Sequence, residues 1–344
     1  MATIDLVELQ KEIEAHNIFR RFHSSGQFSI LNYTPNCSYS KHWTDFTRKC
    51  RGLIIDNSGV ILSRPFEKFW NLSELPGLGI TIPNEPFQAF EKMDGSMGIS
   101  YWFNGKPYLS TRGGFESEQA IKGTQLLQTK YQDQIKNLNP AYTYIFEIIY
   151  PENRIVVDYG QEEKLVHLAT IETETGREDT QTVLGFPVPA VYSQYSDLST
   201  ITQVQLANKE GFVLRFQSGF RVKVKFEEYL KIHRIVTDFS EKRVWEHLSN
   251  HTDVQALIEQ VPDEFYDSMK NTVTKLQSAF ELIENYCKLQ TSVISTLVLS
   301  RKDAAELIKK TNYPSVIFAM YDSKKYDNLI WNLIKPKHLK PLNN

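Results

Sequence analysis

Short runs of aromatic and β-branched residues, separated by Asn, Gly, Pro and Asp, fill residues 27–225 of this 344-residue chain. Such runs are typical of strands, and the short turns between them favour antiparallel sheets over alternating strand and helix units. The runs that we expect to be strands are GLIID, VILSR, GISYWF, YTYIFEIIY, RIVVDY, KLVHLATI, GFVLRF and RVKVKF. Apolar residues at helical spacing predict few helices here, near residues 4–16 and 117–134. We therefore predict an α+β domain of antiparallel sheets with flanking helices.

From about residue 238, apolar residues recur at intervals of three and four, as in DVQALIEQV, DAAELIKK and DEFYDSMKNTVTKLQSAFELIENYCKLQ. This spacing predicts amphipathic helices that pack on each other, and the prolines before Asp263 and Ser315 are typical of helix starts. We expect two domains, one at 1–237 and an all-helical C-terminal domain at 238–344.

Composition excludes several classes of protein. A formal net charge of -2 argues against coating nucleic acid through bulk positive charge and leaves room only for a local basic patch. Three widely spaced cysteines, Cys37, Cys50 and Cys287, indicate neither a disulfide framework nor a zinc site. The acidic, amphipathic N-terminus does not resemble a signal peptide, and no apolar run approaches membrane-spanning length. We expect a cytoplasmic protein without a membrane partner.

The stretch EKMDGSMGIS, residues 91–100, allows two interpretations of Lys92. Asp-Gly between two strand-like runs is a strong hairpin signal, which makes Lys92 an ordinary surface lysine before a turn. The alternative is a nucleophile held where the chain bends. These residues alone favour the hairpin.

The run RVKVKF, residues 221–226, places Lys223 and Lys225 on one face of a strand with Arg221, because successive side chains alternate. The common interpretation of such a pattern is a solvated face of an edge strand. The more specific alternative is a wall of cations that binds phosphate.

Two carboxylates lie in strand contexts. Glu147 is flanked by apolar residues, where a charge is costly unless it is paired or bound to something, and both possibilities stay open. Glu210 precedes Gly211, a residue that permits close backbone approach. A reaction at a nucleotide phosphate needs an amine nucleophile, cations against the phosphate oxygens, and acids for a divalent metal or ribose hydroxyls. Lys92 supplies the amine, Lys223 and Lys225 the cations, and Glu147 and Glu210 the acids.

The order Lys-x-Asp-Gly, Phe-Glu, Glu-Gly and Lys-x-Lys resembles that of covalent nucleotidyltransferases, the ATP-dependent ligases and mRNA capping enzymes. Over roughly residues 30–235 the chain is similar to the phage RNA ligase 1 branch. The matching segments are CRGLI, SRPFEKFWN, EKMDGS, STRGGFESEQA, FEIIYPENRIVVDY, ETETGRE, EGFV and KVKFEEY. The resemblance implies that the first domain is a nucleotidyltransferase (adenylyltransferase) domain.

The resemblance also implies roles for single residues. Lys92 becomes covalently adenylylated, and Lys223 and Lys225 contact the α-phosphate. The further nucleotide-binding positions are Arg51 and Lys68 for the outer phosphates, Trp70, Glu91, Asp94, Gly95, Arg112, Glu147, Glu210, Gly211 and Val213. Glu147 and Glu210 are the expected metal ligands. Arg112 stands where the family has lysine, so its contacts differ. No residue near Leu31 to Tyr33 is assigned to the family's phosphate-contacting tyrosine.

The implied function is an ATP-dependent RNA ligase that uses ATP and Mg²⁺ or Mn²⁺. It joins 5′-phosphate and 3′-hydroxyl RNA ends through lysyl-AMP and RNA-adenylate intermediates, as a monomer, in repair of RNA such as broken tRNA. By analogy, the helical domain serves RNA substrate choice, although its paired basic residues more often mark a solvated face. The alternatives are a DNA ligase, a capping guanylyltransferase, or an inactive nucleotide-sensing or RNA-binding module. Loss of a motif residue, expected for the last of these, is not seen.

Overall fold

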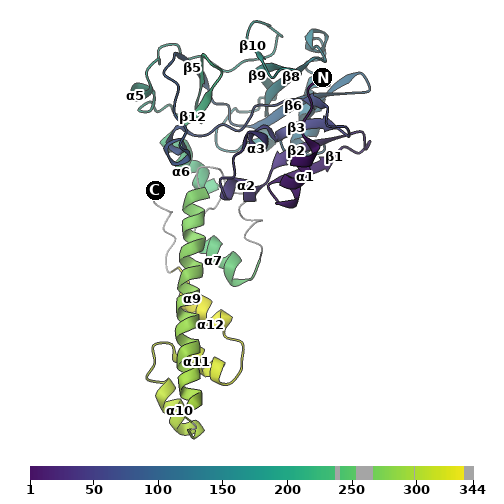
Figure 1. The fold of residues 1–344 in the computed structure, drawn as a ribbon. Coiled ribbons are helices and arrows are strands. Elements are labelled where there is room, and N and C mark those ends of the chain that lie inside the picture. Colours follow the sequence, from purple (N-terminus) through teal and green to yellow (C-terminus); the bar gives the residue numbers. More distant parts are fainter. Residues whose placement is uncertain (237–240, 253–265, 298, 337–344) are drawn as a thin grey trace. The chain divides into compact units, whose positions relative to one another are not determined.

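The computed structural model describes residues 1–236, 241–252, 266–297 and 299–336. The chain divides into two compact units, Met1–Val236 and Thr237–Asn344 (Figure 1). Within the described residues, no helix combines the length and the apolar character that crossing a membrane requires.

The first unit contains three sheets whose strand ladders are antiparallel. The four-stranded sheet has the order β1 (Ile18–Phe22), β2 (Phe28–Tyr33), β3 (Arg51–Asp56), β4 (Ile61–Ser63). The five-stranded sheet has the order β10 (Glu178–Asp179), β9 (Lys164–Glu172), β8 (Tyr142–Ile149), β6 (Ser96–Phe103), β7 (Lys106–Ser110). The three-stranded sheet has the order β12 (Arg221–Lys225), β11 (Gly211–Phe216), β5 (Phe87–Glu91).

Short helices join and flank these sheets. They are α1 (Leu6–Glu14), α2 (Pro35–Tyr39), α3 (Asp45–Lys49), α4 (Glu118–Gln128), α5 (Leu198–Ile201), α6 (Glu227–Val236) and the 3₁₀ turns η1 (Leu72–Glu74), η2 (Pro76–Leu78), η3 (Gln134–Asn137) and η4 (Pro151–Asn153). The predicted α+β class with antiparallel sheets is confirmed. The helix expected at 117–134 is shorter, because α4 ends at Gln128.

Alternation along β11 and β12 builds the core of the three-stranded sheet. Phe212, Leu214 and Phe216 are at most 1% exposed and pack with Val222 and Val224. On the other face of β12, Lys223 and Lys225 are also largely covered. The amide of Lys223 donates to the carbonyl of Trp70, and residues 70–71 run beside the outer edge of β12. The solvated edge-strand interpretation of RVKVKF is therefore wrong.

The run RIVVDY, residues 154–159, is not a strand, and this prediction is wrong. The amides of Val156 and Val157 donate to one carboxylate oxygen of Asp94, at 2.9 and 2.8 Å. A ladder would need these same donors, so the Asp94 carboxylate replaces a neighbouring strand as their partner.

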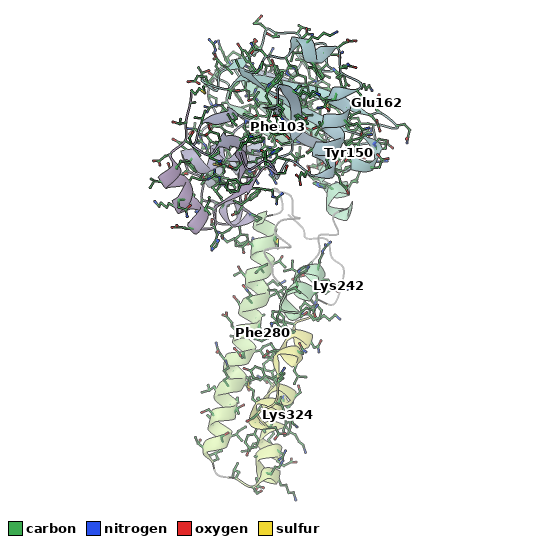
Figure 2. The ribbon with its side chains drawn as sticks, turned by 90° about the vertical axis from the view of Figure 1, so that its right-hand side faces the viewer. Phe103, Tyr150, Glu162, Lys242, Phe280 and Lys324 are labelled. Atoms are coloured by element: carbon green, nitrogen blue, oxygen red, sulfur yellow. The ribbon has the colours of Figure 1, made fainter. Side chains whose placement is uncertain are left out.

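The second unit is helical where it is described, with α7 (Glu241–Ser249), α9 (Tyr266–Thr296), α10 (Arg301–Ile308), α11 (Pro314–Tyr321) and α12 (Asp327–Leu333). Pro314 is the first residue of α11, as predicted. Phe280 lies on α9 (Figure 2). Its ring centre lies 4.8 Å from that of Trp331 on α12. The expected helix DVQALIEQV and the start after Pro262 lie outside the described residues.

Gly211 stands where there is no room for a side chain between β11 and β12. A Cβ atom there would lie 2.0 Å from the carbonyl oxygen of Val224. We expect Gly211→Ala to separate the two strands and lower the free energy of unfolding by about 1 to 3 kcal/mol, as overpacking does. Chemical denaturation measures this. Gly77→Ala is the control, because nothing lies within 4 Å of that position; equal stability of the two variants would contradict the prediction.

Candidate active site

Lys92 lies on a crossover between two sheets, so the predicted hairpin is wrong. The preceding strand, β5, pairs with β11 in the three-stranded sheet, whereas the following strand, β6, pairs with β7 and β8. Gly95 is needed here for close approach, since its Cβ would lie 2.6 Å from the carbonyl oxygen of Ile148. The crossover places Lys92 where both sheets can supply side chains.

A carboxylate directly before β11 holds two of the predicted catalytic lysines. Glu210 Oε2 lies 2.7 Å from Lys92 Nζ, and its Oε1 lies 3.0 Å from Lys225 Nζ. Glu210 is only 2% exposed. Burial alone would raise the pKa of Glu210, but Lys92 and Lys225 outweigh it and lower that pKa. Glu210 therefore stays ionised and fixes both amines 118 and 15 positions away along the chain.

Asp94 anchors the crossover to two distant segments. One carboxylate oxygen of Asp94 accepts hydrogen bonds from the amides of Val156 and Val157. The other oxygen accepts a hydrogen bond of 2.8 Å from the hydroxyl of Tyr229. Tyr229 belongs to α6 and its ring lies 5.3 Å from Lys225 Nζ. Asp94 is 3% exposed, so these hydrogen bonds replace its hydration. These hydrogen bonds fix the position of the chain segment that carries Lys92.

Glu147 reaches the same crossover from the five-stranded sheet. Its Oε1 accepts the amide of Gly95 at 3.0 Å. Burial raises the pKa of Glu147 to about 7, and the nearby charge of Glu210 adds to this, while Lys92 and the Gly95 amide oppose it. Unlike Glu210, Glu147 has a protonation state that changes near neutral pH.

The raised pKa of Glu147 predicts how stability depends on pH. Between 4.5 and about 7 the native carboxyl keeps a proton that the unfolded chain has released, so stability falls as pH rises through this window. At about 1.4 kcal/mol per pH unit the limit is about 3 kcal/mol. Partial exposure of the side chain lowers the expected loss to about 1 to 3 kcal/mol.

Denaturant titrations of the wild type and Glu147→Gln at pH 5 and pH 8 measure this effect. The wild type should lose stability relative to the variant as pH rises. A stability difference between the two proteins that does not change with pH would contradict the assignment.

A second group of cations, Lys68 and Arg112, lies beside Tyr33. Lys68 Nζ lies 5.7 Å from the centre of the Tyr33 ring, and Arg112 donates a hydrogen bond of 3.1 Å to its hydroxyl. The sequence left this tyrosine unassigned. Its partners lie 35 and 79 positions away, so no local pattern could have identified it.

Phe69, next to Lys68 in the chain, connects this group to Lys223 on β12. The guanidinium carbon of Arg51 lies 5.6 Å from the Phe69 ring centre, and Lys223 Nζ lies 5.7 Å from it. Arg51 also donates to the sulfur of Met97, which pairs with Glu147 across β6 and β8. Arg51 thus lies between Phe69 and the strand pair that carries Glu147.

The remaining predicted positions lie on or beside the three-stranded sheet. Glu91 accepts from Lys209 at 2.6 Å and from the hydroxyl of Tyr192 at 3.4 Å. Gly211 and Val213 stand opposite Lys225 and Lys223 in the strand register. Trp70 is buried against Trp43, with ring centres 6.0 Å apart, so the structure places its ring in the core.

The two predicted metal ligands differ in how well they fit a divalent cation. Both oxygens of Glu210 already face lysines. Glu147 has a raised pKa that a cation would relieve, and Mg²⁺ is commonly held by one or two carboxylates together with substrate phosphates. No group of three or more His, Cys, Asp or Glu suited to a metal occurs in the described part of the chain. Glu147 is therefore the better candidate ligand.

The RNA ligase family model matches residues 49–230, more than half of the chain. "Putative bifunctional polynucleotide kinase/RNA ligase" of Autographa californica nuclear polyhedrosis virus is 30% identical over 240 residues, which cover 60% of this chain and 35% of that protein. The chain thus spans about a third of that relative's length. The RNA ligase of Rhodothermus phage RM378 is 23% identical over 345 residues, covering 75% of this chain and 76% of the phage protein.

Among solved structures, an archaeal ATP-dependent RNA ligase is 16% identical, with a TM-score of 0.47. The match covers 89% of this chain and 86% of the archaeal chain. The match to the family model includes Arg51, Lys92, Glu147 and the segment from Glu210 to Lys225. It confirms the likeness to phage RNA ligase 1 that the motifs predicted. The chain belongs to the RNA ligase family.

Proposed function

We propose that this protein is an ATP-dependent RNA ligase that joins 5′-phosphate and 3′-hydroxyl ends. The observation that carries the proposal is the pairing of Lys92 and Lys225 with the buried carboxylate of Glu210 at a crossover between two sheets. This arrangement fixes a primary amine beside a second cation, which a lysine nucleophile for a phosphate needs. These groups need no residue from a second copy of the chain, and we propose a monomer as the active form.

In the proposed reaction, the Lys92 ammonium releases a proton to solvent and the resulting amine attacks the α-phosphorus of ATP. The bond from this phosphorus to pyrophosphate breaks, and lysyl-AMP forms. AMP then passes to the RNA 5′-phosphate, and the 3′-hydroxyl displaces AMP. Lys223 and Lys225 would bind the AMP phosphate in these transfers, and Arg51, Lys68 and Arg112 would bind the outer phosphates. A divalent cation, Mg²⁺ or Mn²⁺, held by Glu147 and the phosphates would neutralise charge on the phosphate oxygens.

Family membership supports RNA as the polymer, and it extends the proposal to repair of broken RNA, with cleaved tRNA as a substrate. By analogy alone, the proposal includes a role of residues 238–344 in substrate choice. Comparing broken tRNAs with linear RNAs, for the full chain and for residues 1–237, tests this role. A truncated protein with the same preference would contradict it.

Labelling tests the reaction. Incubation with α-labelled ATP and magnesium should attach label to the protein, and RNA with 5′-phosphate and 3′-hydroxyl ends should then be joined. The alternatives predict other outcomes: label from GTP for a capping guanylyltransferase, and sealing of nicked duplex DNA without joining of RNA for a DNA ligase. A protein that takes label from neither nucleotide would contradict all three of these activities.

A further inference from the structure

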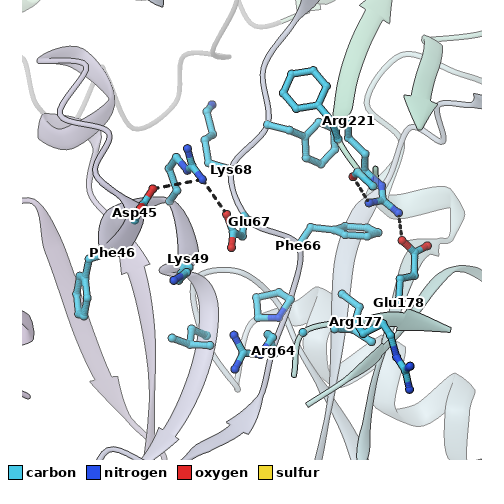
Figure 3. A pocket seen from close by; sticks show the side chains of 18 of the residues that line it. Asp45, Phe46, Lys49, Arg64, Phe66, Glu67, Lys68, Arg177, Glu178 and Arg221 are labelled. Carbon is cyan, nitrogen blue, oxygen red and sulfur yellow. Dashed lines mark hydrogen bonds and ion pairs between the residues drawn. The ribbon is translucent and has the colours of Figure 1, made fainter. Parts of the chain in front are cut away.

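A cleft of about 1090 Å³ lies in the first unit, lined by residues between Thr3 and Arg221 (Figure 3). Its lining includes α3, the extended segment 64–70, the turn between β9 and β10, and the start of β12. Lys92, Glu147 and Glu210 do not line it. Lys68 and Trp70, two of the predicted nucleotide-binding residues, do line it, so the cleft adjoins the nucleotide site. The rest of its lining has no role in the proposed function.

The cleft carries more positive than negative charge. Seven arginine and lysine side chains line it, against five aspartate and glutamate side chains. Glu178 forms ion pairs with both Arg215 and Arg221, so these three side chains together keep a net positive charge. Arg64 donates to the main-chain carbonyls of residues 173 and 174, which hold the guanidinium without cancelling its charge. In a chain with a net charge of -2, this local excess favours an anionic ligand.

Two cations at the rim are well placed for such a ligand. Lys49, at the end of α3, is exposed, and the Arg177 side chain is 80% exposed with its nearest carboxylate at 3.6 Å. Figure 3 shows them on either side of Arg64. Phe46, Phe66 and Phe220 also line the cleft. Cations interleaved with aromatic rings are typical of sites for single-stranded nucleic acid.

The cleft also adjoins the outer-phosphate cations. Lys68 and Phe69 line it, and the same two residues contact Tyr33, Arg51 and Lys223 at the nucleotide site. Segment 64–70 thus separates the cleft from the nucleotide site and contributes residues to both.

The chemistry of AMP transfer indicates on which side of the nucleotide site the RNA strand would lie. In the first step pyrophosphate leaves the phosphorus on the side opposite Lys92. In the second step an oxygen of the RNA 5′-phosphate forms a bond to the same phosphorus, the bond to Lys92 Nζ breaks, and the amine takes up a proton. The RNA phosphate must enter where pyrophosphate left, so its strand leads away past Arg51 and Lys68.

We propose that this cleft binds the backbone of the 5′-phosphorylated RNA strand, next to the phosphate that receives AMP. This proposal rests on the proposed ligase function, because it takes the direction of the strand from the AMP transfer. The ligand is single-stranded RNA, and Lys49 and Arg177 contact its phosphates.

The double variant Lys49→Ala, Arg177→Ala tests the proposal in the full-length protein. Losing two phosphate contacts at about 0.7 each should lower the salt slope of log K for a 5′-phosphorylated 12-nucleotide RNA by about 1.4. We expect AMP transfer to this RNA at subsaturating concentration to fall about 10-fold. Transfer to a 5′-phosphorylated dinucleotide, and labelling of the protein by ATP, should not change.

Lys106→Ala, Lys136→Ala is the control, because both lysines are exposed and do not line the cleft. An unchanged salt slope and unchanged transfer to the 12-nucleotide RNA would overturn the proposal, and would leave a protein partner as the occupant of the cleft. Equal losses for both RNA lengths would overturn it too, as would loss of labelling in the double variant. Failure of the ligase function is distinct, since the wild type itself would then take no label from ATP.

Discussion

Replacing Lys92 by alanine is expected to abolish formation of the covalent protein-AMP adduct and the joining of 5′-phosphate ends. The side chain is the proposed nucleophile, which Glu210 holds at 2.7 Å. Loss of a nucleophile typically costs several orders of magnitude in rate. Gel separation of labelled protein measures the adduct, and labelled RNA measures joining.

The same variant should still seal RNA that already carries a 5′-adenylate. The third step needs the AMP-binding cations but not the Lys92 amine, since the 3′-hydroxyl attacks the RNA-adenylate directly. Retained sealing would show that the variant is folded and that its defect lies in the first two steps. A Lys92→Ala protein that accepts label from ATP would place the nucleophile elsewhere.

Glu210→Gln is expected to have the second largest effect. The amide has the shape of the carboxylate but no charge, so Lys92 and Lys225 lose the counterion that holds them at 2.7 and 3.0 Å. Breaking a buried ion pair on one side costs about 3 kcal/mol or more. A displacement of Lys92 by about 1 Å would lower the rate of protein-AMP formation about 100-fold. Denaturation and single-turnover labelling measure the two effects.

Glu178→Gln is a matched control for this variant. Glu178 also joins two cations, Arg215 and Arg221, in the same unit, but it does not contact Lys92. We expect a comparable loss of stability with protein-AMP formation retained. If Glu178→Gln slowed labelling as much as Glu210→Gln, the defect would be a general consequence of destabilisation, and the proposed role of Glu210 would be wrong.

Local patterns in the sequence predicted the sheets well. Alternation in GFVLRF and RVKVKF correctly separated the core residues from the cations, because a strand has the same period wherever it lies. Motif order also selected residues that the structure brings together, since Lys92 and Lys225 each contact Glu210.

Features that depend on distant partners could not be predicted in this way. Asp94-Gly95 has the composition of a hairpin turn, yet β5 pairs with β11, which is about 120 residues later in the chain. RIVVDY has the composition of a strand, yet Asp94 takes its amides. The position of Tyr33 between Lys68 and Arg112 likewise depends on three segments that meet only in the fold.

The central claim is that Lys92 is the residue that forms the bond to AMP. Peptide mass spectrometry of the full-length protein, after incubation with ATP and magnesium and without RNA, tests it most directly. We predict one added AMP, on the peptide that contains Lys92, and its removal when pyrophosphate is supplied. An AMP found on another residue, or a protein whose mass does not change, would contradict the account.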